Sequence, residues 1–103
     1  MINTLKKIFG IGPSADYKEL VKNGAQIIDV RTKGEYASGH IKGSINIPLN
    51  ELSSQAKKIK KDTVIITCCA SGMRSASAKG IIKQMGHKEV HNGGGWSSLK
   101  NKI

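Results

Sequence analysis

The apolar residues of this chain gather in short compact runs that are separated by longer stretches of mixed character. The compact runs are rich in Ile and Val and are bounded by Gly, Pro or charged residues, which is typical of buried β-strands. They predict strands at residues 25–30, 44–47, 63–67 and 88–91. Three glycines at residues 93–95 follow the last run and predict a mobile hinge or a loop that another part of the backbone approaches closely.

The stretches between the predicted strands carry apolar residues at intervals of three and four, as one face of an amphipathic helix does. This spacing predicts helices over residues 49–59 and 75–85. A further helix is predicted over residues 16–22, and helical turns are predicted at residues 35–38 and 96–99. The expected buried positions of the two longer helices are Leu49, Leu52, Ala56 and Ile59 in the first, and Ala78, Ile81, Ile82 and Met85 in the second.

Strands that alternate with helices indicate βαβ units, which build a mainly parallel sheet with helices on both faces. In such a sheet, ligands bind beyond the carboxyl ends of the strands. Cys69 follows the strand predicted at residues 63–67, so it is expected at this edge of the sheet.

The chain has 103 residues, which is enough for one domain with one core. Residues 1–12 are expected to form a short N-terminal arm, and residues 13–103 are expected to form the domain. No apolar run is long enough to span a bilayer, so stable membrane insertion is not expected. The beginning of the chain lacks the apolar segment and cleavage site of a secretory signal.

The net charge is +10, and fifteen of the seventeen basic residues are Lys. The lysines are scattered and no known nucleic-acid-binding motif accompanies them, so nucleic acid is not an expected partner. The positive field still attracts small anions. The two cysteines, Cys68 and Cys69, are adjacent and cannot cross-link distant parts of one chain. This favours a reducing compartment, and we expect a cytoplasmic protein with a reactive thiol.

The segment from Cys69 to Ser75, with the sequence Cys-Ala-Ser-Gly-Met-Arg-Ser, carries the clearest chemical signal. A strand, a short loop that contains Gly72 and a helix direct backbone N–H groups and the positive end of the helix dipole toward one point. A thiolate at that point is stabilised, so the pKa of Cys69 is expected to fall and make Cys69 a nucleophile near neutral pH. Arg74 adds a permanent positive charge and a forked set of donors suited to oxyanions. An inert, buried cysteine pair is the alternative.

The same loop has a second interpretation, in which the count begins at Cys68. Five residues separate Cys68 from Arg74, as in cysteine-dependent phosphatases and arsenate reductases, whereas four separate Cys69 from Arg74. Thr67 precedes Cys68, where phosphatases usually carry His. The four-residue loop makes the tighter cradle, which suits a single sulfur atom better than a tetrahedral phosphate. The spacing therefore favours sulfur transfer, with phosphoryl chemistry as the alternative.

Three stretches of the chain together resemble the single-domain rhodaneses, a family of sulfurtransferases. They are residues 28–31 with 35–36, residues 39–48, and residues 69–75, which are like the family's active-site loop. The resemblance extends from about residue 14 to residue 100. It implies a rhodanese-like α/β fold, in which a small, mainly parallel five-stranded sheet carries helices on both faces.

The resemblance also implies an activity and the residues that carry it. Cys69 corresponds to the nucleophile that accepts a sulfane sulfur from thiosulfate or a persulfide and passes it to a thiophilic acceptor. Asp29 and Arg31 resemble residues that brace the active-site loop, and His40 resembles a hydrogen-bonded structural histidine. The residues implied to bind the substrate around the Cys69 persulfide are Ala70, Ser71, Gly72, Met73, Arg74 and Ser75.

The partners implied are a small anionic sulfur donor and a thiol acceptor, and the protein is expected to be a monomer. No cofactor and no metal ion are implied. A non-catalytic sulfur carrier or interaction module on the same fold is an alternative. A module without activity, however, has no need for the arrangement of Cys69, Gly72 and Arg74.

Overall fold

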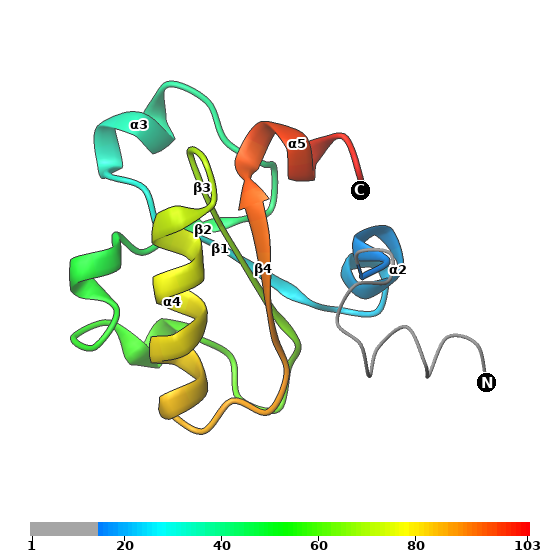
Figure 1. The fold of residues 1–103 in the computed structure, drawn as a ribbon. Helices are drawn as coiled ribbons and strands as arrows, with labels where there is room; N and C mark the ends of the chain where they lie inside the picture. Colours follow the sequence, from blue (N-terminus) through cyan, green and yellow to red (C-terminus); the bar gives the residue numbers. More distant parts are fainter. Residues whose placement is uncertain (1–14) are drawn as a thin grey trace.

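The computed structural model describes residues 15–103, so the arm expected over residues 1–12 lies outside the described residues. Helices and strands alternate along the chain (Figure 1). In chain order the elements are α2 (Tyr17–Lys22), β1 (Gln26–Asp29), α3 (Lys33–Ala37), β2 (Ile45–Asn46), the short 3-10 helices η1 (Leu49–Glu51) and η2 (Ala56–Lys58), β3 (Ile65–Cys69), α4 (Met73–Gln84), β4 (Val90–Gly95) and α5 (Trp96–Lys100).

The sheet within the described residues has four strands, in the order β2-β1-β3-β4, and every neighbouring pair is parallel. The predicted α/β fold with a parallel sheet is confirmed, but the expectation of five strands is wrong. Each compact apolar run supplies one strand, and helices and turns take up the rest of the described chain. No apolar run therefore remains to add a fifth strand there.

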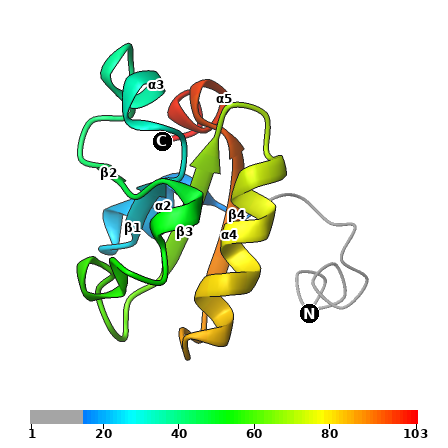
Figure 2. The ribbon, with the colours of Figure 1, turned by 90° about the vertical axis from the view of Figure 1, so that its left-hand side faces the viewer.

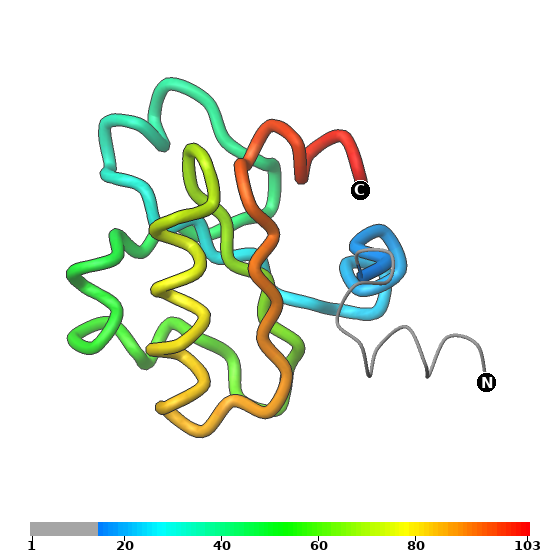
Figure 3. The backbone as a smooth tube through the Cα atoms, viewed as in Figure 1, coloured from blue at the N-terminus to red at the C-terminus, as the bar shows by residue number. Residues whose placement is uncertain are grey.

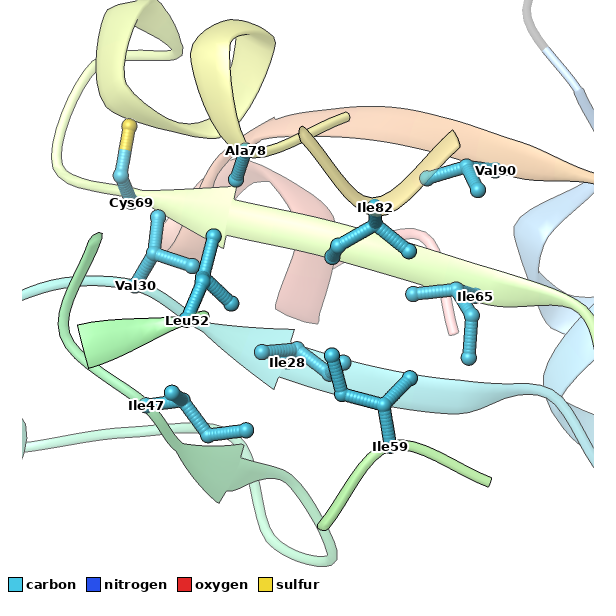
Figure 4. Packing of buried hydrophobic residues seen from close by; sticks show 10 residues of the cluster. All are labelled: Ile28, Val30, Ile47, Leu52, Ile59, Ile65, Cys69, Ala78, Ile82 and Val90. Atoms are coloured by element: carbon cyan, nitrogen blue, oxygen red, sulfur yellow. The ribbon is translucent and has the colours of Figure 1, made fainter. Parts of the chain in front are cut away.

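Both faces of the sheet are buried. Successive residues of a strand point to opposite sides, so each strand supplies apolar side chains to both faces. Ile28 and Ile65 face α4 and pack with Ile82 (Figure 4). Ile27 and Ile66 face the other way, toward α2 and α5, and helices cover both sides of the sheet (Figure 2). Each of these side chains is at most 4% exposed. Burial of one such side chain contributes about 1.5–3 kcal/mol to the free energy of unfolding.

The prediction of one helix over residues 49–59 is wrong. Two short 3-10 helices, η1 and η2, with a turn between them take its place. In that turn the Ser54 hydroxyl donates to the carbonyl oxygen of Glu51 at 3.1 Å, and such bonds compete with helical backbone bonding. Leu52 and Ile59 are nevertheless buried, as their spacing predicted. Leu49 and Ala56, which were also expected to be buried, are only partly buried. The apolar spacing thus identified two of the buried residues but not the backbone conformation between them.

Other predicted elements are present with shifted ends. The helix α4 begins at Met73 and not at residue 75, and its predicted face is confirmed by the full burial of Ala78 and Ile82. The strand β3 runs to Cys69 and not to residue 67. The strand β4 runs to Gly95, so the three glycines belong to a strand and the expectation of a mobile hinge is wrong.

The carboxyl ends of the strands meet at one edge of the sheet. Three segments gather there, which are the β3–α4 loop, α3 and the start of α5, at the upper end of the tube in Figure 3. This edge is where a parallel sheet is expected to bind ligands. It places residues from distant parts of the sequence around Cys69.

Candidate active site

Cys69 is the last residue of β3, and its side chain lies at the end of the core next to α4 (Figure 4). The residue is 1% exposed. The chain then turns at Gly72, the N-cap of α4, which has a left-handed φ of 104°. Gly adopts this conformation without the strain that other residues incur. The turn directs the amide N–H of Gly72 to Cys69 Sγ at 2.9 Å.

Ser75, in the first turn of α4, supplies two further contacts to the sulfur. Its amide N–H donates to Cys69 Sγ at 3.3 Å, and the thiol donates to Ser75 Oγ at 3.3 Å. Burial is the largest influence and raises the pKa of Cys69. Three amides, those of Ser75, Gly72 and Ser71, donate to the sulfur, and the Ser75 hydroxyl can donate to it once the thiol has lost its proton. Together these hydrogen bonds outweigh burial. The pKa of the Cys69 thiol is therefore lowered, in the direction that the sequence predicts.

The residues predicted to surround the substrate differ in what they offer to Cys69. Backbone amides of Ser71, Gly72 and Ser75 act on the sulfur. Met73 belongs to the same turn, but its side chain is 80% exposed, the one large hydrophobic side chain so exposed among residues 15–103. Backbone amides and the Ser75 hydroxyl therefore surround the Cys69 sulfur, whereas the Met73 side chain points to solvent.

The glycines of β4 allow this strand to approach the loop. A Cβ atom on Gly95 would lie 2.9 Å from the carbonyl oxygen of Ala70, and one on Gly93 would lie 2.9 Å from that of Thr67. Real side chains do not tolerate such distances, so these positions require Gly. The alternative of a close backbone approach, which the sequence suggested for residues 93–95, is confirmed.

Asn92 in β4 completes the site, and the sequence analysis missed it. Its Oδ1 accepts from the Ser75 hydroxyl at 2.6 Å and from the Gly94 amide at 2.9 Å. Its Nδ2 donates to the carbonyl oxygen of Gly72 at 3.2 Å. One side chain thus fixes the loop and the hydroxyl beside Cys69. An Asn before glycines is typical of a turn, so the sequence carried no signal for this role.

Arg74 forms an ion pair with Glu35 through two hydrogen bonds, Nη1 to Oε1 at 2.8 Å and Nη2 to Oε2 at 3.0 Å. Glu35 lies in α3, where it also closes a capping box with Thr32. The bond from Arg74, with those from Thr32, lowers the pKa of Glu35 to about 2. The pair joins α3 to α4, and the sequence did not predict it.

Asp29 and Arg31 form a second ion pair beneath the same edge. Arg31 donates to both carboxylate oxygens of Asp29 at 2.8–3.1 Å and to the carbonyl oxygen of Gly39 at 2.6 Å. Its guanidinium lies 4.7 Å from the centre of the Trp96 ring, and the bond to Asp29 raises the pKa of Arg31. These contacts fit the bracing role that the resemblance implies for both residues.

His40 is held by Tyr36. Its Nδ1 lies 2.8 Å from the carbonyl oxygen of Tyr36, and the two rings stack with centres 3.8 Å apart. The Tyr36 hydroxyl in turn donates to the carbonyl oxygen of Ser44 at 2.7 Å. The hydrogen bond of His40 therefore lies within its own segment, as expected of a structural histidine.

Cys68 points to the face opposite Cys69 and packs with Ile66 and Leu99. Burial raises the pKa of Cys68 to about 12, and the charge of Asp29 acts in the same direction. Cys68 therefore remains a protonated, buried thiol at neutral pH. The phosphatase-like count, which needs a nucleophile at this position, gains no support from the geometry.

One cleft of the surface contains neither Cys69 nor the loop that follows it. This cleft has a volume of 310 Å³ and lies at the opposite end of the sheet, where the chain enters β3 and β4. Contacts to the Cys69 sulfur, and not the size of a hollow, therefore define the candidate site. The residues that line the cleft are Asp62, Thr63, Val64, Gly86, His87, Lys88 and Glu89.

No helix within residues 15–103 has both the length and the apolar character needed to cross a membrane.

Comparisons with known proteins agree with this architecture. The profile of the Rhodanese-like domain matches residues 14–102. The chain is 44% identical over 75 residues to the thiosulfate sulfurtransferase PspE of Escherichia coli strain K12. The aligned region covers 70% of this chain and 71% of PspE. It is 36% identical over 80 residues to the uncharacterized protein YqhL of Bacillus subtilis strain 168. This aligned region covers 77% of this chain and 64% of YqhL. The solved structure of the human single-domain sulfurtransferase TSTD1 matches with a TM-score of 0.71 at 28% identity, over 84% of this chain and 90% of that one.

The chain belongs to the rhodanese-like domain family, because the family profile covers nearly all of it. The rhodanese-like α/β fold is confirmed by the structural match to TSTD1. Relatives named as thiosulfate sulfurtransferases place the chain in a sulfurtransferase family. The chain spans 64% of the length of YqhL and 71% of the length of PspE.

Proposed function

We propose that this protein is a sulfurtransferase that carries a sulfane sulfur as a persulfide on Cys69. The observation that carries the proposal is the set of hydrogen bonds to the Cys69 sulfur, from the Gly72 amide at 2.9 Å and the Ser75 amide at 3.3 Å. The lowered pKa of Cys69 increases the fraction of the residue that is present as the nucleophilic thiolate. The same donors stabilise the negative charge of the persulfide that forms.

The reaction is a double displacement. The Cys69 thiolate attacks the outer sulfur of thiosulfate, the S–S bond of the donor breaks, and sulfite leaves with the electron pair. With a persulfide donor, the donor thiolate leaves instead. The thiolate of an acceptor then attacks the outer sulfur of the Cys69 persulfide, and Cys69 leaves as the thiolate. A small sulfur donor and a thiol acceptor are thus the only reactants, and no redox partner is needed.

The proposal is tested by intact mass spectrometry after incubation with thiosulfate. One added sulfur, lost again when a thiol is added, is expected for the wild type and not for Cys69→Ser. Production of sulfite over many turnovers in the presence of a thiol separates an enzyme from a stoichiometric sulfur carrier. A wild-type mass unchanged by both thiosulfate and a small persulfide would contradict the proposal.

A further inference from the structure

Both arginines of the chain lie at the edge of the sheet that holds Cys69, and both are paired with a carboxylate. The Arg31–Asp29 pair is buried, with side chains 4% and 0% exposed, whereas the Arg74–Glu35 pair is about one-third exposed. The other fifteen basic residues are lysines. The two guanidinium charges that the chain places at this edge are therefore each balanced by a neighbouring carboxylate.

Arg74 is near enough to Cys69 for their charges to interact. It lies in the first turn of α4, beside Ser75, whose amide touches the Cys69 sulfur. The bond to Glu35 is the main cause of the raised pKa of Arg74, and the charge of ionised Cys69 adds to it. An unpaired guanidinium at this place would attract a doubly charged donor strongly and a weakly charged donor less. The carboxylate of Glu35 opposes that attraction.

We propose that Glu35 is a specificity-determining residue, which by pairing with Arg74 makes the site favour sulfur donors of low charge, such as a small thiol persulfide, over the dianion thiosulfate. This inference rests on the proposed sulfurtransferase function and names the class of donor. The bidentate geometry is its basis, because both carboxylate oxygens of Glu35 are bound to Arg74. A donor anion that binds the same N–H groups must displace a carboxylate already in place.

Glu35→Gln tests the proposal with little structural change. In the wild type, Glu35 Oε1 accepts from the Thr32 amide at 2.9 Å and closes the capping box of α3. The amide oxygen of Gln can still accept that bond, whereas its NH₂ group cannot accept from Arg74. The substitution thus removes the negative charge opposite Arg74 and keeps the helix cap.

The measurement is the second-order rate constant for formation of the Cys69 persulfide, followed by quenched-flow mass spectrometry. The donors are thiosulfate and 2-hydroxyethyl persulfide, which carries at most one negative charge. Glu35→Gln should raise the rate constant with thiosulfate relative to that with the persulfide by about two- to fivefold, the size expected of a partly exposed charge pair. Glu19→Gln removes one exposed carboxylate from α2, on the other face of the sheet, and should leave the ratio unchanged.

The double variant Glu35→Gln/Arg74→Gln replaces one neutral pair with another and guards against a folding defect in the single variant. Its ratio of rate constants should stay within about twofold of the wild type, because the substitutions remove two opposite charges together and leave the net charge near Cys69 unchanged. A large loss of thiosulfate use in this double variant would show that Arg74 binds the donor directly and would overturn the proposal. An unchanged or lower ratio in Glu35→Gln would also overturn it. Failure of the wild type to form a persulfide with either donor would instead contradict the proposed function.

Discussion

Cys68 and Cys69 are neighbours in the chain, yet their thiol groups lie on opposite faces of the sheet. Cys69 belongs to the apolar cluster beneath α4, and Cys68 belongs to the cluster beneath α2 and α5. The alternation of side chains along a strand separates them. The two thiols therefore have opposite chemistry, since the pKa of Cys69 is lowered and that of Cys68 is raised to about 12.

The first prediction assigns the nucleophile. Cys69→Ser should abolish sulfur transfer from thiosulfate or a small persulfide to a thiol, because the attacking thiolate is lost. Cys68→Ser should keep most of the activity. It should lose about 1–3 kcal/mol of unfolding free energy, because the hydroxyl is buried on an apolar face. Steady-state kinetics and denaturant unfolding check the two effects. An active Cys69→Ser together with an inactive Cys68→Ser would show that Cys68 is the nucleophile and would favour the phosphatase-like interpretation of the loop.

The second prediction concerns the ionisation of the two thiols. The rate of iodoacetamide alkylation at Cys69 should rise with pH through a midpoint below about 8.5, the ordinary pKa of a free Cys. Cys68 should remain unmodified in the folded protein up to pH 9, because its pKa is about 12. Peptide mapping after alkylation identifies the modified residue. A midpoint at or above that of a free thiol would remove the evidence for an electrostatic cradle.

The third prediction isolates the Ser75 hydroxyl, which accepts from the Cys69 thiol at 3.3 Å. Once the thiol ionises, the hydroxyl can donate to the thiolate instead, and this lowers the pKa of Cys69. Ser75→Ala should raise the alkylation midpoint of Cys69, because the thiolate loses a hydrogen bond from the hydroxyl. Ser77→Ala, at an exposed position of the same helix, is the matched control and should leave the midpoint unchanged. Equal midpoints in the two variants would show that the amides alone determine the pKa.

The fourth prediction concerns two glycines with different surroundings. Gly95→Ala should lower the free energy of unfolding by about 1–3 kcal/mol and slow persulfide formation, because the new methyl group meets the Ala70 carbonyl oxygen. Gly80→Ala lies within α4 with no atom in the way, and it should stabilise the protein by about 0.5–1 kcal/mol. Denaturant unfolding measures both changes. A neutral Gly95→Ala would mean that the loop moves aside without cost.

The fifth prediction follows from the pKa of Glu35, which is about 2 in the folded protein and near 4.5 without its partners. The ion pair with Arg74 stabilises the fold fully above the unfolded pKa, and this contribution disappears as the pH falls toward 2. The difference in unfolding free energy between the wild type and Arg74→Gln should therefore be constant above pH 5 and shrink between pH 5 and pH 2. Lys79→Gln serves as the control, because its difference from the wild type should not shrink between pH 5 and pH 2. A difference between the wild type and Arg74→Gln that does not change with pH would argue against the ion pair.

The sequence by itself determined the order of strands and helices, the reactive loop and the buried positions. The runs that end at Val30 and Thr67 became the centre of the sheet, and Leu52 and Ile59 are buried although the helix predicted for them is absent. Such local patterns are readable in the sequence, because the period at which apolar residues recur indicates the type of element and which of its side chains face the core. The segment from Cys69 to Ser75 could be recognised for the same reason, because its strand, turn and helix are consecutive.

Only the tertiary structure decided which distant residues complete the site. Glu35 reaches Arg74 across 39 positions of sequence, and Asn92 reaches Ser75 across 17. Neither partner stands out in the sequence, since a Glu in a short helix and an Asn before glycines have ordinary local roles. The parallel sheet brings α3, α4 and β4 to one edge, and this long-range packing decides the charge around the Cys69 sulfur and the position of its hydroxyl neighbour. Local sequence patterns do not contain that information, because they do not specify which elements become neighbours.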